Sequence, residues 1–440
     1  MSTPRVAFTY ERLPNGLRYI LAPDPLAPVV AVNIWYGVGS RHEVEGRTGF
    51  AHLFEHVMFQ GSAHVTKAEH ISLIQAAGGT MNGTTWLDRT NYFETLPSHR
   101  LDLALWLEAD RMATLLDALN QDNLDNQREV VKNEKRWSYD NQPYGLWSHK
   151  LQAHLFPADH PYHHPTIGSM EDLDGASIED VASFFRTWYT PNNAVLSIVG
   201  DFDAAEARAS VERYFGPIAA APPPPPLPDM SLPLSLGGEV REEVADRVPL
   251  TRVYLGFRAP VFGDPRLRAL EIGGQILAGG KGSRLHRRLV REERIAQDVT
   301  FFVMGFVGGA SIAAGWATVR PGVEAARVEA AYLEELDRLG REPVTGDELG
   351  RAHALVETES LAALQRVEDR ADQLSMYATL FDDPDRINRE LAGYLAVTAE
   401  DVRFACAEVF RPDNRAVITY VPAAEEAPPE PGAAGEEAAA

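Results

Sequence analysis

Two histidines and a glutamate occur together near the start of the chain, in the segment HLFEH that begins at His52 and ends at His56. No glycine or proline interrupts residues 50–60, so this stretch can form a helix. Residues i and i+4 share one face of a helix, which lets both imidazoles reach a single metal ion. Glu55 would lie beside that ion and could accept a proton from a water molecule held there. The spacing therefore predicts a zinc site of the inverted H-x-x-E-H type, with Glu55 as the general base.

The alternative is an amphipathic helix whose histidines are merely solvated. The apolar residues of the segment would pack such a helix on a core, namely Leu53, Phe54, Val57 and Met58. The two histidines and Glu55 have no evident packing role on the remaining surface. The pattern therefore favours chemistry over simple solvation.

A catalytic zinc ion needs a third protein ligand and one open position. A second helix predicted over residues 124–138 supplies two candidates, Glu129 and Glu134. At about 100° per residue they lie ~140° apart around the helix, so both cannot bind the same ion. Spacing alone does not choose between these two glutamates.

The charge of the chain limits its partners. It has 440 residues with 41 basic and 63 acidic side chains, for a net charge of −22, and about −17 remains without the five acids of the C-terminal tail. Such an acidic body argues against nucleic acid or an anionic membrane surface as a partner. Cys406 is the single cysteine, so neither an intrachain disulfide nor a cysteine zinc site can form.

An uncharged run at residues 299–319 is long enough to span a bilayer. It contains four glycines and many β-branched and aromatic residues, which predicts two strands joined by a tight turn instead. The N-terminus lacks the apolar core of a signal peptide. We therefore expect a cytoplasmic protein without a membrane span, unless a targeting segment has been removed.

The two halves of the chain repeat one another on either side of a run of five prolines at residues 222–226. Ser177 and Thr398, 221 residues apart, each begin a predicted helix with acidic residues in its first turn. Each helix ends before a Pro-Asn or Pro-Asp turn, and a β-rich run follows. A repeat of this length indicates a duplicated domain.

We therefore predict an α+β fold of two duplicated domains, each a mostly antiparallel sheet covered by helices. A cleft between them is the expected place for a site. The predicted boundaries are a zinc-binding catalytic domain at 1–220, a Pro-rich linker at 221–238, a homologous domain at 239–422 and a disordered acidic tail at 423–440. The predicted long helices cover residues 101–115, 124–138, 322–339 and 346–366.

Four short motifs occur between residues 39 and 92, and one of them contains the histidine segment. They are Gly39-Ser40-Arg41, Gly49-x-x-His52-x-x-Glu55-His56-x-x-Phe59-x-Gly61-Ser62, Gly78-Gly79-x-x-Asn82-Gly83-x-Thr85 and Asp88-x-Thr90-x-Tyr92. With these motifs the chain resembles the pitrilysin-type inverzincin zinc peptidases, in particular the branch of the mitochondrial processing peptidase and its bacterial relatives. The resemblance covers nearly the whole chain, including the duplication.

The resemblance implies a zinc-dependent endopeptidase that hydrolyses unstructured peptides and holds one Zn²⁺ per chain. It implies that Glu134 is the third ligand, and that Gln127 takes a supporting position at which many relatives have a glutamate. It also implies an edge strand that pairs with an extended substrate. The residues of that strand are Asn82, Gly83, Thr84 and Thr85.

One departure from the family concerns the second half. Relatives that act alone carry an arginine and, seven residues later, a tyrosine, both of which bind substrate. This chain keeps Arg291 but has Asp298 in place of the tyrosine. We therefore expect the zinc-bearing subunit of a heterodimer, whose sister chain carries the Arg/Tyr pair. The alternatives are a self-sufficient homodimeric peptidase and, less favoured, a non-catalytic scaffold of the same fold.

Overall fold

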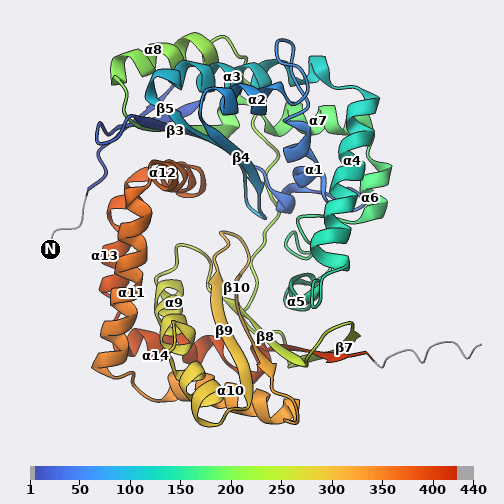
Figure 1. The fold of residues 1–440 in the computed structure, drawn as a ribbon, viewed down its shortest axis with the longest axis vertical. Coiled ribbons are helices and arrows are strands. Elements are labelled where there is room, and N and C mark those ends of the chain that lie inside the picture. Colours follow the sequence, from blue (N-terminus) through green and yellow to red (C-terminus); the bar gives the residue numbers. More distant parts are fainter. Residues whose placement is uncertain (1–4, 424–440) are drawn as a thin grey trace, which may run out of the picture.

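The computed structural model describes residues 5–423, which form two β-sheets with helices around them (Figure 1). The first sheet has the strand order β1-β2-β6-β3-β5-β4 and the second has the order β7-β11-β8-β10-β9. The strands of the first sheet are β1 (Thr9–Arg12), β2 (Arg18–Pro23), β3 (Val29–Tyr36), β4 (Thr80–Thr85), β5 (Thr90–Pro97) and β6 (Ala194–Gly200). Those of the second are β7 (Val240–Asp246), β8 (Arg252–Ala259), β9 (Ala296–Met304), β10 (Ser311–Val319) and β11 (Ala416–Pro422).

The helices of the first half are α1 (Phe50–Val57), α2 (Glu69–Ala76), α3 (Leu101–Ala118), α4 (Gln121–Lys135), α5 (Trp147–Leu155), α6 (Met170–Gly175), α7 (Ile178–Trp188) and α8 (Ala204–Phe215). Those of the second half are α9 (Pro265–Ala278), α10 (Ala325–Arg341), α11 (Gly346–Gln365), α12 (Val367–Phe381), α13 (Glu390–Leu395) and α14 (Ala399–Val409). The four long helices predicted from the sequence are all present, with ends shifted by a few residues.

The duplication is visible in the strand pairing. Each sheet has one parallel pair, β2 with β6 and β7 with β11, and its other pairs are antiparallel. Ser177 and Thr398 form capping boxes at the starts of α7 and α14, as the repeat predicted. The predicted α+β fold with two duplicated domains is confirmed. The predicted tail at 423–440 lies, apart from residue 423, outside the described residues.

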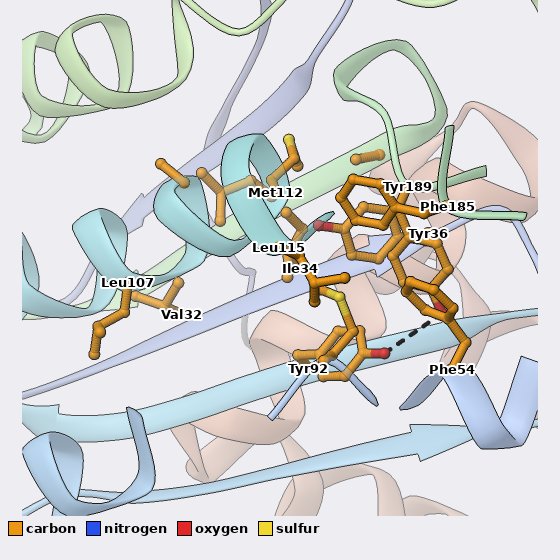
Figure 2. Packing of buried hydrophobic residues seen from close by; sticks show 14 of the residues in the cluster. Val32, Ile34, Tyr36, Phe54, Tyr92, Leu107, Met112, Leu115, Phe185 and Tyr189 are labelled. Carbon is orange, nitrogen blue, oxygen red and sulfur yellow. Dashed lines mark hydrogen bonds between the residues drawn. The ribbon is translucent and has the colours of Figure 1, made fainter. Parts of the chain in front are cut away.

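The first sheet is buried on both faces. Val32, Ile34 and Tyr36 of β3 point toward α3, where they contact the cluster that includes Leu107 and Met112 (Figure 2). The alternate residues of the sheet, such as Ala31 and Val195, pack instead against α12. Because side chains alternate along a strand, β3 and β6 need helices on both sides to bury their apolar residues.

Each half contributes a helix to the sheet of the other. Helix α12 belongs to the second half but lies on the side of the first sheet that faces that half (Figure 1). In return, α5 packs on the second sheet, where the Trp147 ring stacks on Tyr254 with centroids 5.1 Å apart. Leu151 and Leu155 of α5 belong to the buried apolar cluster that contains Tyr254. Contacts therefore extend in both directions across the predicted domain boundary.

The uncharged run at 299–319 forms β9 and β10, as predicted. The connection between them, residues 305–310, is longer than the predicted tight turn. Its backbone is bound by the first half, since Val307 N donates to Asp88 Oδ2 at 3.1 Å and Gly308 N donates to the Tyr162 hydroxyl at 3.0 Å. Among residues 5–423, no helix combines the length and the apolar character needed to cross a membrane.

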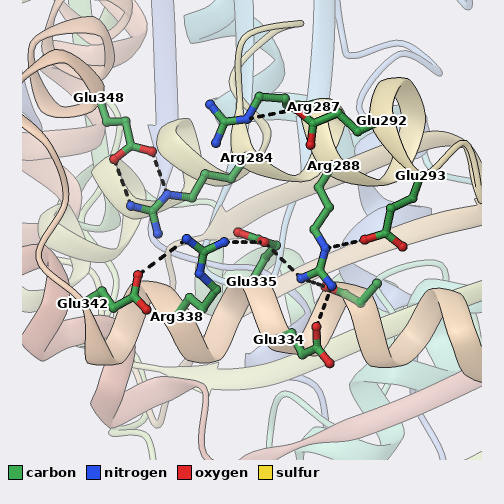
Figure 3. A network of polar contacts seen from close by, with 11 residues as sticks. Arg284, Arg287, Arg288, Glu292, Glu293, Glu334, Glu335, Arg338, Glu342 and Glu348 are labelled. Atoms are coloured by element: carbon green, nitrogen blue, oxygen red, sulfur yellow. Dashed lines mark hydrogen bonds and ion pairs between the residues drawn. The ribbon is translucent and has the colours of Figure 1, made fainter.

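A network of arginines and glutamates holds the helical segment His286–Glu292, which carries Arg291, against α10 and α11 (Figure 3). Arg284 donates to both carboxylate oxygens of Glu348 at 2.7 and 2.8 Å. Arg288 contacts Glu293 and the buried Glu335. This part of the second half is therefore fixed by ion pairs as well as by its apolar core.

Candidate metal centre

Helix α1 positions the two histidines. Its buried residues, Phe50, Leu53, Phe54 and Val57, fasten one face to the core. Glu43 accepts hydrogen bonds from Gly49 N at 2.8 Å and Ala51 N at 2.7 Å, and so caps the N-terminus of the helix with a carboxyl group. Burial raises the pKa of Glu43 to about 8, against the effect of these two hydrogen bonds. The opposite face of α1 is left to His52, Glu55 and His56.

Helix α4 brings Glu134, and not Glu129, close to the two histidines. Glu134 lies opposite α1, with Oε1 3.7 Å from His52 Nε2 and Oε2 3.3 Å from His56 Nε2. Glu129 is turned away and forms an ion pair with Lys132 at 2.9 Å. The helix widens into a π-turn over residues 136–140, which begins two residues after Glu134. Such turns are frequent at functional sites.

The three side chains fit a zinc ion. One donor atom from each of His52, His56 and Glu134 lies within 4.8 Å of the others. Donors ~2.0–2.2 Å from a tetrahedral zinc ion are separated by about 3.3–3.6 Å, which is close to the distances from Glu134 to both imidazoles. Two imidazoles and one carboxylate leave the fourth position open, as in catalytic rather than structural zinc sites.

The electrostatics of the cluster favour a cation. Burial, assisted by the charge of His56, lowers the pKa of His52 to about 4, so its imidazole is neutral at pH 7 and available as a ligand. The hydrogen bond with His56 lowers the pKa of Glu134, against the effect of burial. His52 therefore presents a neutral nitrogen and Glu134 an anionic oxygen, which are the forms that bind zinc.

The side chain of Glu55 projects from α1 toward strand β4. Thr85 Oγ1 donates a hydrogen bond to Glu55 Oε2 at 2.6 Å. Burial raises the pKa of Glu55, and the hydrogen bond from Thr85 opposes that rise. A Cβ atom at Gly83 would lie 3.2 Å from Glu55 Cγ and 3.0 Å from the Tyr92 ring. Glycine at this position therefore allows the strand to approach Glu55 closely.

Strand β4 is one of the two edge strands of the first sheet, since among residues 5–423 it pairs with β5 alone. The predicted substrate-binding segment, from Asn82 to Thr85, forms the last four residues of this six-residue strand. Its outer edge can pair with a further extended segment. The structure thus brings the strand, Glu55 and the histidines to one place.

Two of the predicted site residues, Arg291 and Gln127, are not seen to contact the metal-ligand candidates. Arg291 does not line the 340 Å³ cavity that adjoins His52 and Glu55. Asp298, which stands in place of the expected tyrosine, lies on β9 and accepts a hydrogen bond from Trp316 Nε1 at 3.2 Å. Gln127 is buried in α4, but its amide donates to Asn126 Oδ1 at 3.0 Å. His52 Nδ1 has no hydrogen-bond partner among the described residues, so the predicted support of a histidine by Gln127 is not seen.

A cavity of 340 Å³ adjoins Glu55, His52 and Glu134, and both halves form its walls. The first half contributes chiefly β4, the loop after it and α5, and the second half contributes residues around the β9–β10 connection. Its apolar lining comprises Trp86, Leu87, Tyr139, Trp147, Leu151, Ile167, Met304, Phe306 and Ile312. A larger hollow of 1370 Å³, between residues 41–48 and the Pro-rich segment 225–228, includes none of the three metal-ligand candidates.

Sequence reasoning missed the contact that joins the two halves at this cavity. Asp88 is 4% exposed and accepts from Arg41 Nη1 at 2.8 Å, from the Tyr162 hydroxyl and from Val307 N. It therefore links the turn after β4 to the β9–β10 connection. Asp88 occurs in a recognised motif, but nothing in the local sequence identifies Val307 as its partner.

A duplicated α+β fold with two histidines and a glutamate gathered beside a sheet edge defines a class of two-domain protein with a candidate zinc centre in its first half. Residues 18–159 match the family described as Insulinase (Peptidase family M16), and residues 175–356 match the Peptidase M16 inactive domain. The chain belongs to peptidase family M16, and the predicted pitrilysin-type membership is confirmed. Helix α9 lies within the segment that matches the inactive domain, and it contains no histidine.

Several relatives are similar over most of their length. The chain is 28% identical over 379 residues to zinc protease PqqE of Helicobacter pylori, covering 83% of this chain and 82% of that one. It is 25% identical over 400 residues to an uncharacterized zinc protease of Streptomyces coelicolor, covering 90% and 86%. Its structure superposes on the crystal structure of a protease from Helicobacter pylori with a TM-score of 0.88 and 26% identity, covering 94% of this chain and all of that one.

Proposed function

We propose that the chain is a zinc-dependent endopeptidase that hydrolyses unstructured peptides, with one Zn²⁺ held by His52, His56 and Glu134. The observation that carries this proposal is the position of Glu55 on the same helix as both histidines, beside a free sheet edge. Relatives named zinc proteases support the choice of metal. The proposed domains are those expected from the sequence, with the catalytic groups in the first.

The residues of the chain have separate roles in this reaction. Bound zinc supplies Lewis acidity, which polarises a peptide carbonyl and makes a water molecule more acidic. The carboxylate of Glu55 accepts the proton of the attacking water and later delivers it to the leaving amine. Thr85 orients that carboxylate through its hydrogen bond to Oε2. The walls of the 340 Å³ cavity provide a partly apolar surface beside Glu55, His52 and Glu134.

The substrate is held as an added strand. An extended peptide pairs with the backbone of residues 82–85, which requires a segment free of its own tertiary structure. The largely apolar cavity beside Glu55 accommodates an apolar side chain next to the scissile bond. The net charge of −22 favours basic over acidic peptides and disfavours nucleic acid and anionic membranes.

The proposed assembly is a heterodimer in the cytoplasm. Asp298 stands where self-sufficient relatives have tyrosine, and a carboxylate cannot donate a hydrogen bond to a substrate carbonyl. We therefore propose that a sister chain supplies an Arg/Tyr pair and that Arg291 alone does not replace it. A self-sufficient homodimer is the second candidate, because Arg291, the member of the pair that this chain keeps, is exposed.

The test is cleavage of a quenched fluorescent, unstructured peptide by the zinc-loaded chain, with Glu55→Gln as the blank. Zinc-dependent cleavage that Glu55→Gln abolishes supports the peptidase and identifies a self-sufficient enzyme. One bound zinc per chain without cleavage points to the heterodimer, and cleavage should then appear on adding the sister chain. Failure to bind zinc at the His52/His56/Glu134 cluster would overturn the proposal in favour of a scaffold.

A further inference from the structure

A row of polar side chains crosses the first sheet on the face covered by α12. Trp35 on β3 is paired with Asn91 on β5, and Asn91 is paired with Thr84 on β4. Paired residues of neighbouring strands project to the same face of a sheet. Asn91 is 2% exposed, so its amide must find partners inside the protein.

The carboxylate that completes this row comes from the other half of the chain. Asp372 on α12 accepts hydrogen bonds at Oδ1 from Trp35 Nε1 at 2.8 Å, Asn91 Nδ2 at 3.0 Å and Asn33 Nδ2 at 3.2 Å. All three donors are buried. A charged acceptor makes such hydrogen bonds stronger than a neutral one.

Asn91 connects Asp372 to the edge strand β4. Its Oδ1 accepts from the Thr84 hydroxyl at 2.5 Å and from Arg89 Nη1 at 2.9 Å, and Arg89 also donates to the Thr84 carbonyl at 2.8 Å. The amide nitrogen of Asn91 must point to Asp372 for its oxygen to face these two donors. Without Asp372 the amide can turn over and place its NH₂ group against Arg89, which has no acceptor, so the hydrogen bond from Arg89 to Asn91 is lost.

Strand β4 is thus held from both faces at consecutive residues. Thr84 faces the α12 side and is bound by Asn91, whereas Thr85 faces α1 and donates to Glu55. Movement of Thr84 along or away from the sheet also moves Thr85, because the two are adjacent in one strand.

We propose that Asp372 is a positioning residue for the candidate metal centre, acting from the opposite half of the chain through Asn91 and Thr84 on the peptide-binding edge strand. Its consequence for catalysis rests on the proposed peptidase function. The effect of Asp372 on the position of β4 does not depend on that function. Asp372 therefore makes the order of β4 depend on the docking of α12 from the second half.

Hydrogen exchange in the full-length, metal-free protein tests the effect on β4 directly. In Asp372→Ala, amide exchange in residues 80–85 should become about tenfold faster, because a charge-assisted hydrogen bond to a buried amide is lost. Ser375→Ala is the matched control. Ser375 lies on the same helix and bonds Ser197 Oγ at 2.7 Å, but it does not contact Asn91. Equal exchange of β4 in the two variants would overturn the proposal.

Two further variants keep the test decisive. Asp372→Asn keeps an acceptor oxygen but not the charge, so exchange of residues 80–85 should be slower than in Asp372→Ala and faster than in the wild type. If Asp372→Ala does not fold, Asn91→Ala removes the connecting amide while leaving α12 in place, and should cause the same faster exchange. Unchanged protection of residues 80–85 in Asn91→Ala would count against the proposal in the same way.

Peptide hydrolysis tests the catalytic consequence. Asp372→Ala should raise KM more than it lowers kcat, and its effect on kcat/KM should not add to that of Asn91→Ala. Additive losses would show that Asp372 acts by another route. If the wild-type chain cleaves no peptide, with or without a sister chain, the proposed function fails, while the exchange experiment still decides whether Asp372 positions β4.

Discussion

Thr85 Oγ1 donates a hydrogen bond to Glu55 Oε2 at 2.6 Å and thereby joins the edge strand to the helix that carries both histidines. The bond uses one carboxylate oxygen, so the other remains for proton transfer. It also lowers the pKa of Glu55, which burial raises. The strand proposed to bind substrate therefore also sets the orientation and the acidity of the proposed base.

Replacing Thr85 by valine should keep the shape of the side chain and remove only this hydrogen bond. We expect kcat to fall about 10–150-fold, in line with the loss of one hydrogen bond to a charged group. The pKa of Glu55 should rise, and because a base must be deprotonated, the acid limb of the pH–rate profile should move to higher pH. Thr80→Val, at the exposed start of the same strand, is the control and should leave the profile unchanged.

Glu134→Gln should remove an anionic ligand while preserving the volume of the side chain. We expect zinc affinity to fall by more than about 100-fold, since even outer partners of ligands contribute 10–100-fold. Glu129→Gln, on the same helix, loses only the ion pair with Lys132 and should bind zinc like the wild type. Competition with a chromogenic chelator measures both, and equal affinity of the two variants would exclude Glu134 as a ligand.

Asp88→Ala should destabilise the protein strongly, because Arg41 and Tyr162 would keep buried polar groups without their acceptor. Removing one partner of a buried pair typically costs about 3–5 kcal/mol in the free energy of unfolding. Glu179→Ala, which breaks the exposed pair with Arg186, should cost about 0–1 kcal/mol. Urea unfolding of the metal-free proteins compares them, and a similar midpoint for both variants would contradict this role of Asp88.

Glu94 should make stability depend on pH. Burial raises its pKa from 4.5 to about 7, so the folded chain holds a proton that the unfolded chain releases. The stability this provides is present below pH 4.5 and lost as pH rises through 7. Glu94→Gln should therefore gain on the order of 2–3 kcal/mol relative to the wild type between pH 5 and pH 8, as measured by urea unfolding of metal-free protein.

Glu11→Gln is the control for that experiment, because the pKa of Glu11 is lowered in the folded chain whereas that of Glu94 is raised. The hydrogen bond from Arg208 chiefly lowers the pKa of Glu11 to about 2, so its contribution is lost only as pH falls from about 4.5 toward 2. The difference between Glu11→Gln and the wild type should therefore stay constant from pH 5 to pH 8. A constant difference for Glu94→Gln as well would show that Glu94 is already ionised at pH 5.

Much of the candidate site followed from short patterns. The i, i+4 spacing of His52 and His56 needs only a helix, and the sequence around them forms one. The helix caps at Ser177 and Thr398 depend on residues three positions away and were equally predictable. The choice of Glu134 over Glu129 required the resemblance to a family, because the rotation of one helix against another is not encoded locally.

Other features depended on contacts that no local pattern describes. The turn between β9 and β10 was expected to be tight, but it is longer because its backbone binds Asp88 and Tyr162 of the first half. Gln127 was expected to support a histidine, and instead bonds Asn126. Hydrogen-bond partners of buried amides depend on which surfaces meet, and a single sequence does not show this.

The sequence by itself determined the two duplicated α+β units and the helix with two histidines, because periodicity, capping and turn residues act over a few positions. The edge strand at residues 82–85 was expected only from the resemblance to a family. Only the tertiary structure decided that Glu134 faces the histidines, that α12 covers the sheet of the other half and that Asp372 reaches Asn91, 281 residues away. Such contacts depend on the simultaneous burial of apolar faces from distant segments, and that packing fixes which polar groups meet.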